Sequence, residues 1–230
     1  MKKYAKFIEG LFIREGKNRF IGFVLINEQI HECYVPNSSK MEKYIQLTNK
    51  VVLLTENGDS KSRTKFSLFA VRHKDKYVLL DLRLVNECLE QAIQSGFVYP
   101  DNNYSVVREK YIGGYKADLC LADNAEQIIV EAKGVISLEA RINFPGIFSR
   151  RFENQLTRLL SMLRDGWSIS YIIVSMSPFI EQIQLNSPSK QFNKLFFDCL
   201  DQGMDLKQLS LELCDGKIGY RSRNPELILK

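Results

Sequence analysis

Residues Tyr115–Lys133 have the sequence YKADLCLADNAEQIIVEAK, and this stretch decides the fold of the second half of the chain. Residues 116–121 alternate between polar and apolar side chains, and residues 123–124 are the turn formers Asp and Asn. Residues 127–133 then contain a β-branched apolar run. This pattern predicts two strands joined by a turn.

Three polar side chains stand on this predicted hairpin: Asp118 on its first strand, and Glu131 and Lys133 near the end of its second. Because side chains alternate along a strand, Glu131 and Lys133 face the same side. Two carboxylates and the Ala132 carbonyl can hold Mg²⁺ or Mn²⁺, ions that activate water and bridge to phosphate oxygens. Glu109 is a fourth candidate ligand. The predicted catalytic residues are Asp118, Glu131 and Lys133, with the ammonium stabilising negative charge.

The acid-x-Lys triplet is by itself a weak signal, since it also occurs at residues 15–17, 59–61 and 215–217. Residues 131–133 differ because they end an apolar strand and follow an Asp on the paired strand. An ordinary ion pair between Glu131 and Lys133 at a strand end is the alternative interpretation.

Composition places the chain among soluble globular proteins. Its 230 residues are 45% hydrophobic and 26% charged, enough for one large domain or two small ones. No apolar run reaches the roughly 20 residues of a membrane span, and charges interrupt the signal-like N-terminus. Five scattered cysteines without a CxxC pair argue against a disulfide framework or a zinc site, and favour a cytoplasmic location.

The positive charge is confined to the first third of the chain. Residues 1–80 hold 15 Lys and Arg against 8 Asp and Glu, a balance of +7, whereas residues 81–230 hold 17 against 19, a balance of −2. A basic region next to aromatic residues suits a polyanionic partner, chiefly nucleic acid. A basic surface that only confers solubility is the alternative.

Residues 1–80 show short strands at regular spacing with polar turns, which predicts an OB-like β-barrel. Strands are expected at residues 11–13, 20–26, 29–35, 50–55, 66–72 and 77–82. Such a barrel can follow a nucleic-acid backbone and stack bases. The side chains expected to do so are Arg19, Lys61, Arg63, Lys65 and Phe66.

Residues 81–230 predict an α/β domain with a mixed sheet. Helices are expected at residues 82–95, 149–164 and 190–203, strands at 170–175 and 206–213, and a partly frayed tail at 215–230. Residues 106–110 are either a strand or the start of a short helix. The helix at 149–164 has an apolar face and a polar stripe of Arg151, Gln155 and Arg158. We interpret Arg151 and Gln155 as nucleic-acid contacts, with an ordinary solvated helix face as the alternative.

Several segments together resemble the sugar-fermentation-stimulation (SfsA) protein family over nearly the full chain. Residues 17–20 (KNRF) resemble its basic-aromatic segment, and residues 35–41 (VPNSSKM) its Pro-Asn-Thr-Gly-x-Met signature. Residues 116–118 (KAD) resemble its Arg-Ile-Asp strand, and residues 131–135 (EAKGV) its Glu-Val-Lys-x-Val strand. Phe144-Pro145 and residues 149–151 resemble the loop and helix start that follow.

This resemblance implies an N-terminal OB-like domain joined to a PD-(D/E)xK (restriction-endonuclease-like) domain, with DNA binding and a metal site. Asp118, Glu131 and Lys133 match the nuclease core, and Glu109 matches loosely as its upstream acid. The chain departs from the family pattern at Ser38-Ser39 for Thr-Gly, at Gly146 for Asp, and at residues 151–156 (RFENQL), which lack the Lys and His of Arg-Gly-x-Lys-His-Leu.

The function these features predict is a metal-dependent nuclease with a basic N-terminal nucleic-acid-binding domain. A DNA-binding or regulatory protein with a nuclease fold and no cleavage activity is the alternative. We expect nucleic acid as the partner, DNA rather than RNA, with no membrane. The oligomeric state is left open, and a homodimer is one of the outcomes compatible with the sequence.

Overall fold

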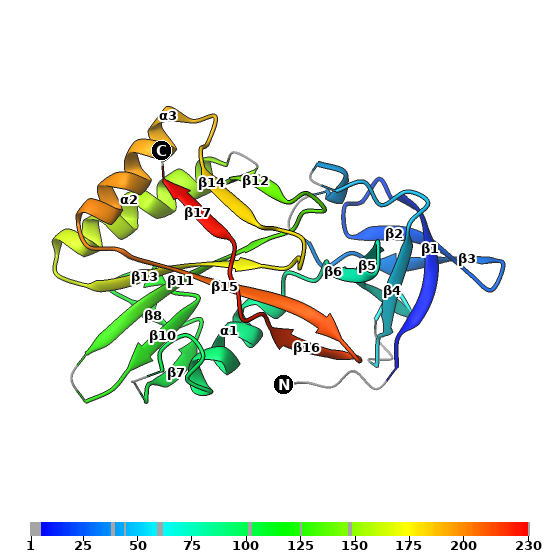
Figure 1. Cartoon of the computed structure of the whole chain (residues 1–230), viewed down its shortest axis with the longest axis horizontal. Helices are drawn as coiled ribbons and strands as arrows, with labels where there is room; N and C mark the ends of the chain where they lie inside the picture. Colours follow the sequence, from blue (N-terminus) through cyan, green and yellow to red (C-terminus); the bar gives the residue numbers. More distant parts are fainter. Residues whose placement is uncertain are drawn as a thin grey trace.

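A computed structural model of the chain describes residues 6–37, 40–43, 45–58, 62–100, 103–124, 126–146 and 149–229. A barrel formed by the first third of the chain lies beside a larger α/β unit formed by the rest (Figure 1). Within the described residues, no helix is both long enough and apolar enough to cross a membrane.

The N-terminal unit is a closed five-stranded barrel, which confirms the predicted OB-like fold. Its strands pair in the order β3-β2-β1-β4-β5, and pairing of β3 with β5 closes the barrel, while β6 extends it beyond β5. Register shifts in the β1–β2 and β4–β5 pairings mark bulges, which provide the curvature that closure needs. The strands are β1 (Ile8–Glu15), β2 (Ile21–Ile26), β3 (Gln29–Tyr34), β4 (Val51–Glu56), β5 (Phe66–His73) and β6 (Lys76–Leu79), with a 3₁₀ turn η1 (Met41–Lys43).

The C-terminal unit is built on a mixed sheet, also as predicted. Its order is β16-β15-β13-β11-β10-β7, with β11, β13 and β15 parallel and the outer strands antiparallel. Its strands are β7 (Ser105–Arg108), β10 (Leu119–Ala122), β11 (Gln127–Val135), β13 (Ser168–Ser175), β15 (Asp205–Cys214) and β16 (Lys217–Tyr220).

Two hydrophobic cores lie on the two faces of this sheet. Helices α2 (Arg150–Arg164) and α3 (Lys190–Asp201) cover one face, and their N-termini are capped by Ser149 and Ser189. The apolar side of α2 buries Leu156, Leu159, Leu160 and Leu163, as its helical spacing predicts. Helix α1 (Leu84–Gln94) and the barrel pack on the other face.

Four short strands form elements that were not predicted. Strand β12 (Arg141–Phe144) pairs in parallel with β14 (Gln182–Leu185), and β8 (Tyr111–Ile112) pairs with β9 (Tyr115–Lys116) in a small hairpin. The prediction of a frayed C-terminal tail is wrong: β16 and β17 (Glu226–Leu229) are paired strands, and β17 completes the small sheet beside β14.

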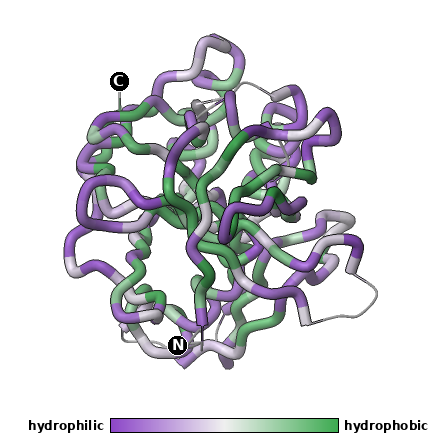
Figure 2. Tube along the Cα trace, turned by 90° about the vertical axis from the view of Figure 1, so that its right-hand side faces the viewer, coloured by the Kyte–Doolittle hydropathy of each residue, from purple (hydrophilic) through white to green (hydrophobic). Residues whose placement is uncertain are grey.

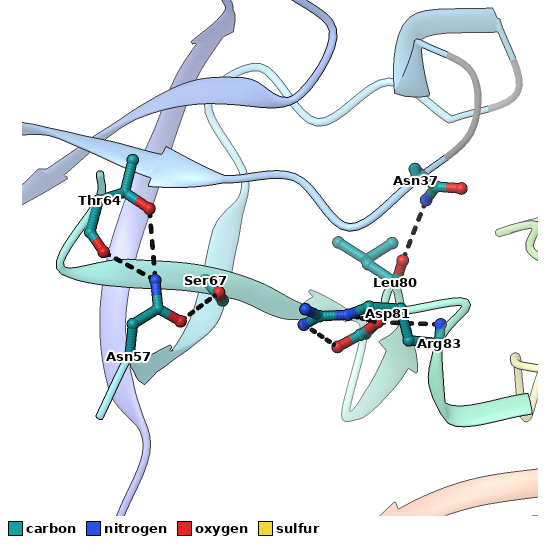
Figure 3. Close-up of polar contacts among 7 residues, drawn as sticks. All are labelled: Asn37, Asn57, Thr64, Ser67, Leu80, Asp81 and Arg83. Carbon is teal, nitrogen blue, oxygen red and sulfur yellow. Dashed lines mark hydrogen bonds and ion pairs between the residues drawn. The ribbon is translucent and has the colours of Figure 1, made fainter. Parts of the chain in front are cut away.

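The barrel and the α/β unit share one continuous core. Buried residues of β5 and β6 belong to the same cluster as α1, β11 and β13. The Leu79 N–H donates to the Met176 carbonyl (2.9 Å), and the buried Asn37 amide donates to the Leu80 carbonyl (3.0 Å; Figure 3). Hydrophobic segments accordingly gather in the interior, with hydrophilic segments along the outer loops (Figure 2). The two units are therefore held in one fixed arrangement.

Candidate metal centre

Glu131 stands at the centre of the predicted site. It lies on β11 opposite Tyr171 of β13, and only 1% of its surface is exposed. Its Oε1 accepts from the Lys133 ammonium and from the Gln155 amide (2.5 Å), and its Oε2 accepts from the Tyr115 hydroxyl. Both carboxylate oxygens are therefore oriented by protein donors.

Asp118 was predicted to lie on the first strand of the hairpin, but the structure places it in the turn between β9 and β10. Its Oδ2 accepts from the Ala132 N–H (2.9 Å) and its Oδ1 accepts from the Asn86 amide of α1 (3.4 Å). Because the N–H and C=O of one strand residue point to the same side, the Ala132 carbonyl faces the side on which Asp118 lies. The structure thus brings together the two carboxylates and the carbonyl that were predicted as ligands.

The electrostatics of the site are dominated by burial. Burial raises the pKa of Glu131 above its ordinary value, and the neighbouring Asp118 carboxylate raises it further, while Lys133 acts in the opposite direction. Burial also raises the pKa of Tyr115, and the Glu131 charge adds to that effect. Tyr115 is therefore a neutral hydroxyl donor toward Glu131 at neutral pH.

Lys133 lies on the same face of β11 as Glu131, as predicted. Its side chain is 16% exposed, and its ammonium lies 5.2 Å from the centre of the Phe152 ring on α2. The ammonium is therefore held between the Glu131 carboxylate and the face of an aromatic ring.

Glu109 is a correction to the predicted ligand set. Its backbone has φ of 54°, and its exposed carboxylate pairs with the Lys116 ammonium at 2.6 Å. Only its N–H reaches the site, by donating to the Asp118 carbonyl (2.9 Å). The left-handed backbone turns its side chain toward the β8–β9 hairpin, so the Glu109 carboxylate is not brought to Asp118.

The polar stripe of α2 divides into three different environments. Gln155 points inward, where it donates to Glu131 and to the Tyr115 hydroxyl (2.9 Å), so its interpretation as a surface contact for nucleic acid is corrected. Arg158 donates to the Gly113 carbonyl of the hairpin. Arg151, at the start of α2, is exposed and remains a predicted nucleic-acid contact.

The predicted contacts on the barrel also differ in placement. Arg19 and Arg63 are exposed, and Lys65 lies 3.6 Å from Glu56. Phe66, expected to stack on bases, is 4% exposed and belongs to the core, because it pairs with β3 where the barrel closes. Lys61 lies outside the described residues.

Two site residues, Tyr115 and Asn86, were not predicted. Tyr115 opens the stretch quoted first, but the predicted alternation began at residue 116 and gave Tyr115 no role. Asn86 lies on the predicted helix at residues 82–95, and nothing local distinguishes it from a solvent-facing amide. A contact between Asn86 and a residue 32 positions later is tertiary information.

The donor set fits a hard divalent cation. Two carboxylates and a backbone carbonyl are oxygen ligands of the kind that Mg²⁺, Mn²⁺ and Ca²⁺ take, with water completing the coordination. Among the described residues, no group of three or more His, Cys, Asp or Glu side chains is arranged to hold a metal. The backbone carbonyl and water would therefore have to supply a large share of the ligands.

Two family models match the chain in sequence. The "SfsA N-terminal OB domain" matches residues 15–80, and the "Sugar fermentation stimulation protein RE domain" matches residues 83–216. The chain belongs to the sugar fermentation stimulation protein family. Its combination of an OB domain with a nuclease-like domain suggests nucleic-acid binding.

Curated members of the family align over most of the chain. A sugar fermentation stimulation protein homolog of Clostridium beijerinckii is 26% identical over 86% of this chain and 85% of its own. One from Natranaerobius thermophilus is 25% identical over 95% and 93%. The solved structure of Pyrococcus furiosus SfsA in complex with Ca²⁺ has a TM-score of 0.85 at 20% identity, covering 98% of this chain and 97% of the other. This likeness supports the two-domain fold described above.

Proposed function

We propose that this protein is a metal-dependent nuclease that hydrolyses phosphodiester bonds in DNA or RNA. The observation that carries the proposal is the convergence of Asp118, Glu131 and the Ala132 carbonyl beside the Lys133 ammonium. Support also comes from the Ca²⁺ bound by Pyrococcus furiosus SfsA, a relative of the same fold. In this role, Mg²⁺ or Mn²⁺ would supply an activated water and neutralise charge on the phosphate.

Each residue of the site has a separate part in the proposed reaction. Asp118, Glu131 and the Ala132 carbonyl hold the cation. Lys133 places a positive charge where negative charge develops on the phosphate oxygens, and does so in a largely buried position where that charge is screened little. Tyr115 and Gln155 fix the Glu131 carboxylate, and the Ala132 N–H and Asn86 fix Asp118.

The second candidate function is nucleic-acid binding without cleavage, and one observation favours it. Glu131 already accepts from Lys133, Gln155 and Tyr115, so a cation must compete with Lys133 and Gln155 for Oε1. A site whose ligand oxygens are satisfied by its own side chains can preserve a nuclease fold after its activity is lost.

Cleavage assays separate the two functions. Plasmid DNA, single-stranded DNA and RNA are incubated with wild type, Asp118→Asn, Lys133→Ala and Glu109→Gln, in Mn²⁺, in Mg²⁺ and in EDTA. We expect cleavage by wild type only with metal, and a loss of about 100-fold or more in Asp118→Asn and Lys133→Ala. Glu109→Gln is the matched control, because that carboxylate pairs with Lys116 outside the site, and it should cleave like wild type.

The nuclease proposal fails if wild type leaves all three substrates intact with both metals. Retention of nucleic-acid binding in the same preparation, with a strong salt dependence, then supports the binding function.

A further inference from the structure

Two arginines and two aromatic rings form a continuous row across the junction between the OB domain and the nuclease-like domain. The Arg19 guanidinium lies 4.5 Å from the centre of the Phe20 ring, and the Phe20 and Tyr34 rings are nearly parallel, 18° apart with centroids separated by 6.2 Å. The Arg83 guanidinium lies 5.2 Å from the centre of the Tyr34 ring. We call these four residues the aromatic–arginine row.

The OB-domain end of the row is fixed by a tight turn. Asn18 accepts from the Phe20 N–H through its side chain (3.0 Å) and from the Ile21 N–H through its carbonyl (3.0 Å). Gly16 donates to the Ile21 carbonyl (2.7 Å), and a Cβ at Gly16 would lie 2.9 Å from that oxygen, so the turn requires glycine. Phe20 is therefore presented by a rigid loop, although it precedes β2.

The other end of the row is fixed by an ion pair. Asp81 is 8% exposed on its side chain, and it accepts from Arg83 through both oxygens, at 2.9 Å from Nε and 2.7 Å from Nη2 (Figure 3). The Arg83 side chain is 57% exposed. The forked contact holds the guanidinium plane in one orientation, and such a plane can support a stacked ring as well as an aromatic residue can.

The Arg83 end of the row and a residue that contacts Asp118 belong to the same helix, α1. Arg83 is the N-cap of α1, and Asn86, which donates to Asp118, lies three residues later. Residues three apart on a helix lie on the same side, with Cβ atoms about 5–6 Å apart. Since the two domains share one core, the distance between the row and Asp118 is set by the fold.

The charge and chemistry of the row fit unpaired nucleotides. Two adjacent aromatic rings with a guanidinium group at each end offer flat surfaces to bases and positive charge to phosphates. In a duplex the base faces are covered by neighbouring base pairs, so only a single strand can use these rings. The row also lies in the part of the chain with a balance of +7, apart from Arg83, which begins the second domain.

We propose that the aromatic–arginine row binds a single-stranded stretch of nucleic acid directly beside the candidate metal centre. Phe20 and Tyr34 are each half-buried and contact their neighbours in the row, so bases pack against the parts of the two rings that stay accessible, and phosphates contact Arg19. The proposal deepens the proposed function, because it makes the substrate single-stranded where it passes from the OB domain to Asp118. Binding to the row does not depend on cleavage.

Fluorescence anisotropy in EDTA tests the row without any contribution from catalysis. The probes are a labelled oligo(dT) and a duplex of the same length, and the variants are Phe20→Leu and Tyr34→Leu, which keep an apolar side chain but remove the ring. We expect each variant to bind oligo(dT) about tenfold more weakly, as for the loss of one stacked base. Duplex binding should change less than about twofold, since phosphate contacts are retained.

Phe97→Leu is the matched control, because Phe97 is an exposed ring (46%) that packs on Tyr220 away from the row. It should bind oligo(dT) like wild type, and thermal melts should show that all variants are folded. Equal losses for oligo(dT) and duplex, or no loss in either row variant, would overturn the proposal. Asp118→Asn should keep full oligo(dT) affinity, so an inactive metal site and a failed row give different results.

Discussion

At the scale of single residues, the state of Glu131 controls whether the site can take a cation. A carboxylate has about four lone-pair positions, and three donors already occupy positions on Glu131. Burial raises the pKa of this carboxyl, so its proton is retained to a higher pH than in an ordinary Glu. Protonation and the internal ion pair both compete with a metal at this one side chain.

Metal affinity should therefore depend on pH over a range above that of an exposed Glu. The ionised form binds the cation and its pKa is raised, so affinity falls as pH falls through the raised pKa. Below that pKa the loss should be about tenfold per pH unit. Calorimetric titration with Mn²⁺ between pH 4.5 and 8 measures this fall in metal affinity. A flat profile above pH 5 would show that Glu131 is ionised throughout.

A hydroxyl deletion gives a second measure of the same effect. Tyr115→Phe removes the donor to Glu131 Oε2, so the anionic carboxylate loses a stabilising hydrogen bond. The fall in metal affinity should therefore begin at a higher pH than in wild type. Tyr111→Phe is the matched control, because Tyr111 belongs to the same hairpin and is 73% exposed. If metal affinity depends on pH in both variants as it does in wild type, Tyr115 has no influence on Glu131.

The sequence predicted those residues of the site that belong to the strand–turn–strand pattern of residues 115–133. Glu131 and Lys133 lie on β11, and Asp118 immediately precedes the paired strand β10, so the pairing of these two strands brings the three residues together. Asn86 could not be found in this way, because its contact depends on how α1 packs. Glu109 was predicted as a ligand from its loose match alone, and the sequence gives no sign that its carboxylate pairs with Lys116 of the β8–β9 hairpin.

At the scale of elements, the packing of α1 on β11 positions one side of the site. Gly134 follows Lys133, and a Cβ there would lie 2.6 Å from Leu82 Cδ2 and 2.8 Å from Val85 Cγ2. The absent side chain lets the start of α1 approach the strand, and the same helix carries Asn86 to Asp118.

Gly134→Ala should destabilise the protein by about 1–3 kcal/mol through overpacking. The midpoint of urea unfolding measures this change. Gly219→Ala on β16 is the matched control, since its Cβ would have nothing within 4 Å, and its effect should stay within about 0.5 kcal/mol. Equal midpoints for the two variants would contradict a close contact between α1 and β11.

Elements with a strong local period were predicted well, and those defined by distant pairing were not. The apolar spacing of α2 and the β-branched runs of β11 and β13 indicate their structure without tertiary context. Strands β12, β14 and β17 are four residues each, and each is a strand only through pairing in this small sheet, where β14 lies between β12 and β17. For the same reason, the last residues of the chain looked like a polar tail.

At the scale of the whole molecule, the shared core couples the stability of the two domains. Asn37→Ala in the OB domain would leave the buried Leu80 carbonyl without this donor, at a cost of about 1–3 kcal/mol. The single Trp of the chain, Trp167, lies in the nuclease-like domain and reports its unfolding by fluorescence. We expect the variant to lower the midpoint of unfolding by the same amount whether it is followed by Trp167 fluorescence or by circular dichroism. A Trp167 transition that stays at the wild-type midpoint would show that the domains unfold separately.

The continuous core also bears on how this architecture can evolve. In many proteins a linker joins domains, and a gene fusion can exchange one domain for another without exposing apolar surface. Here only residues 80–83 separate β6 from α1, and the Leu79 N–H is paired with a carbonyl of the other domain. A foreign OB domain would have to reproduce that surface in full. The two halves should therefore be inherited together and diverge as a pair.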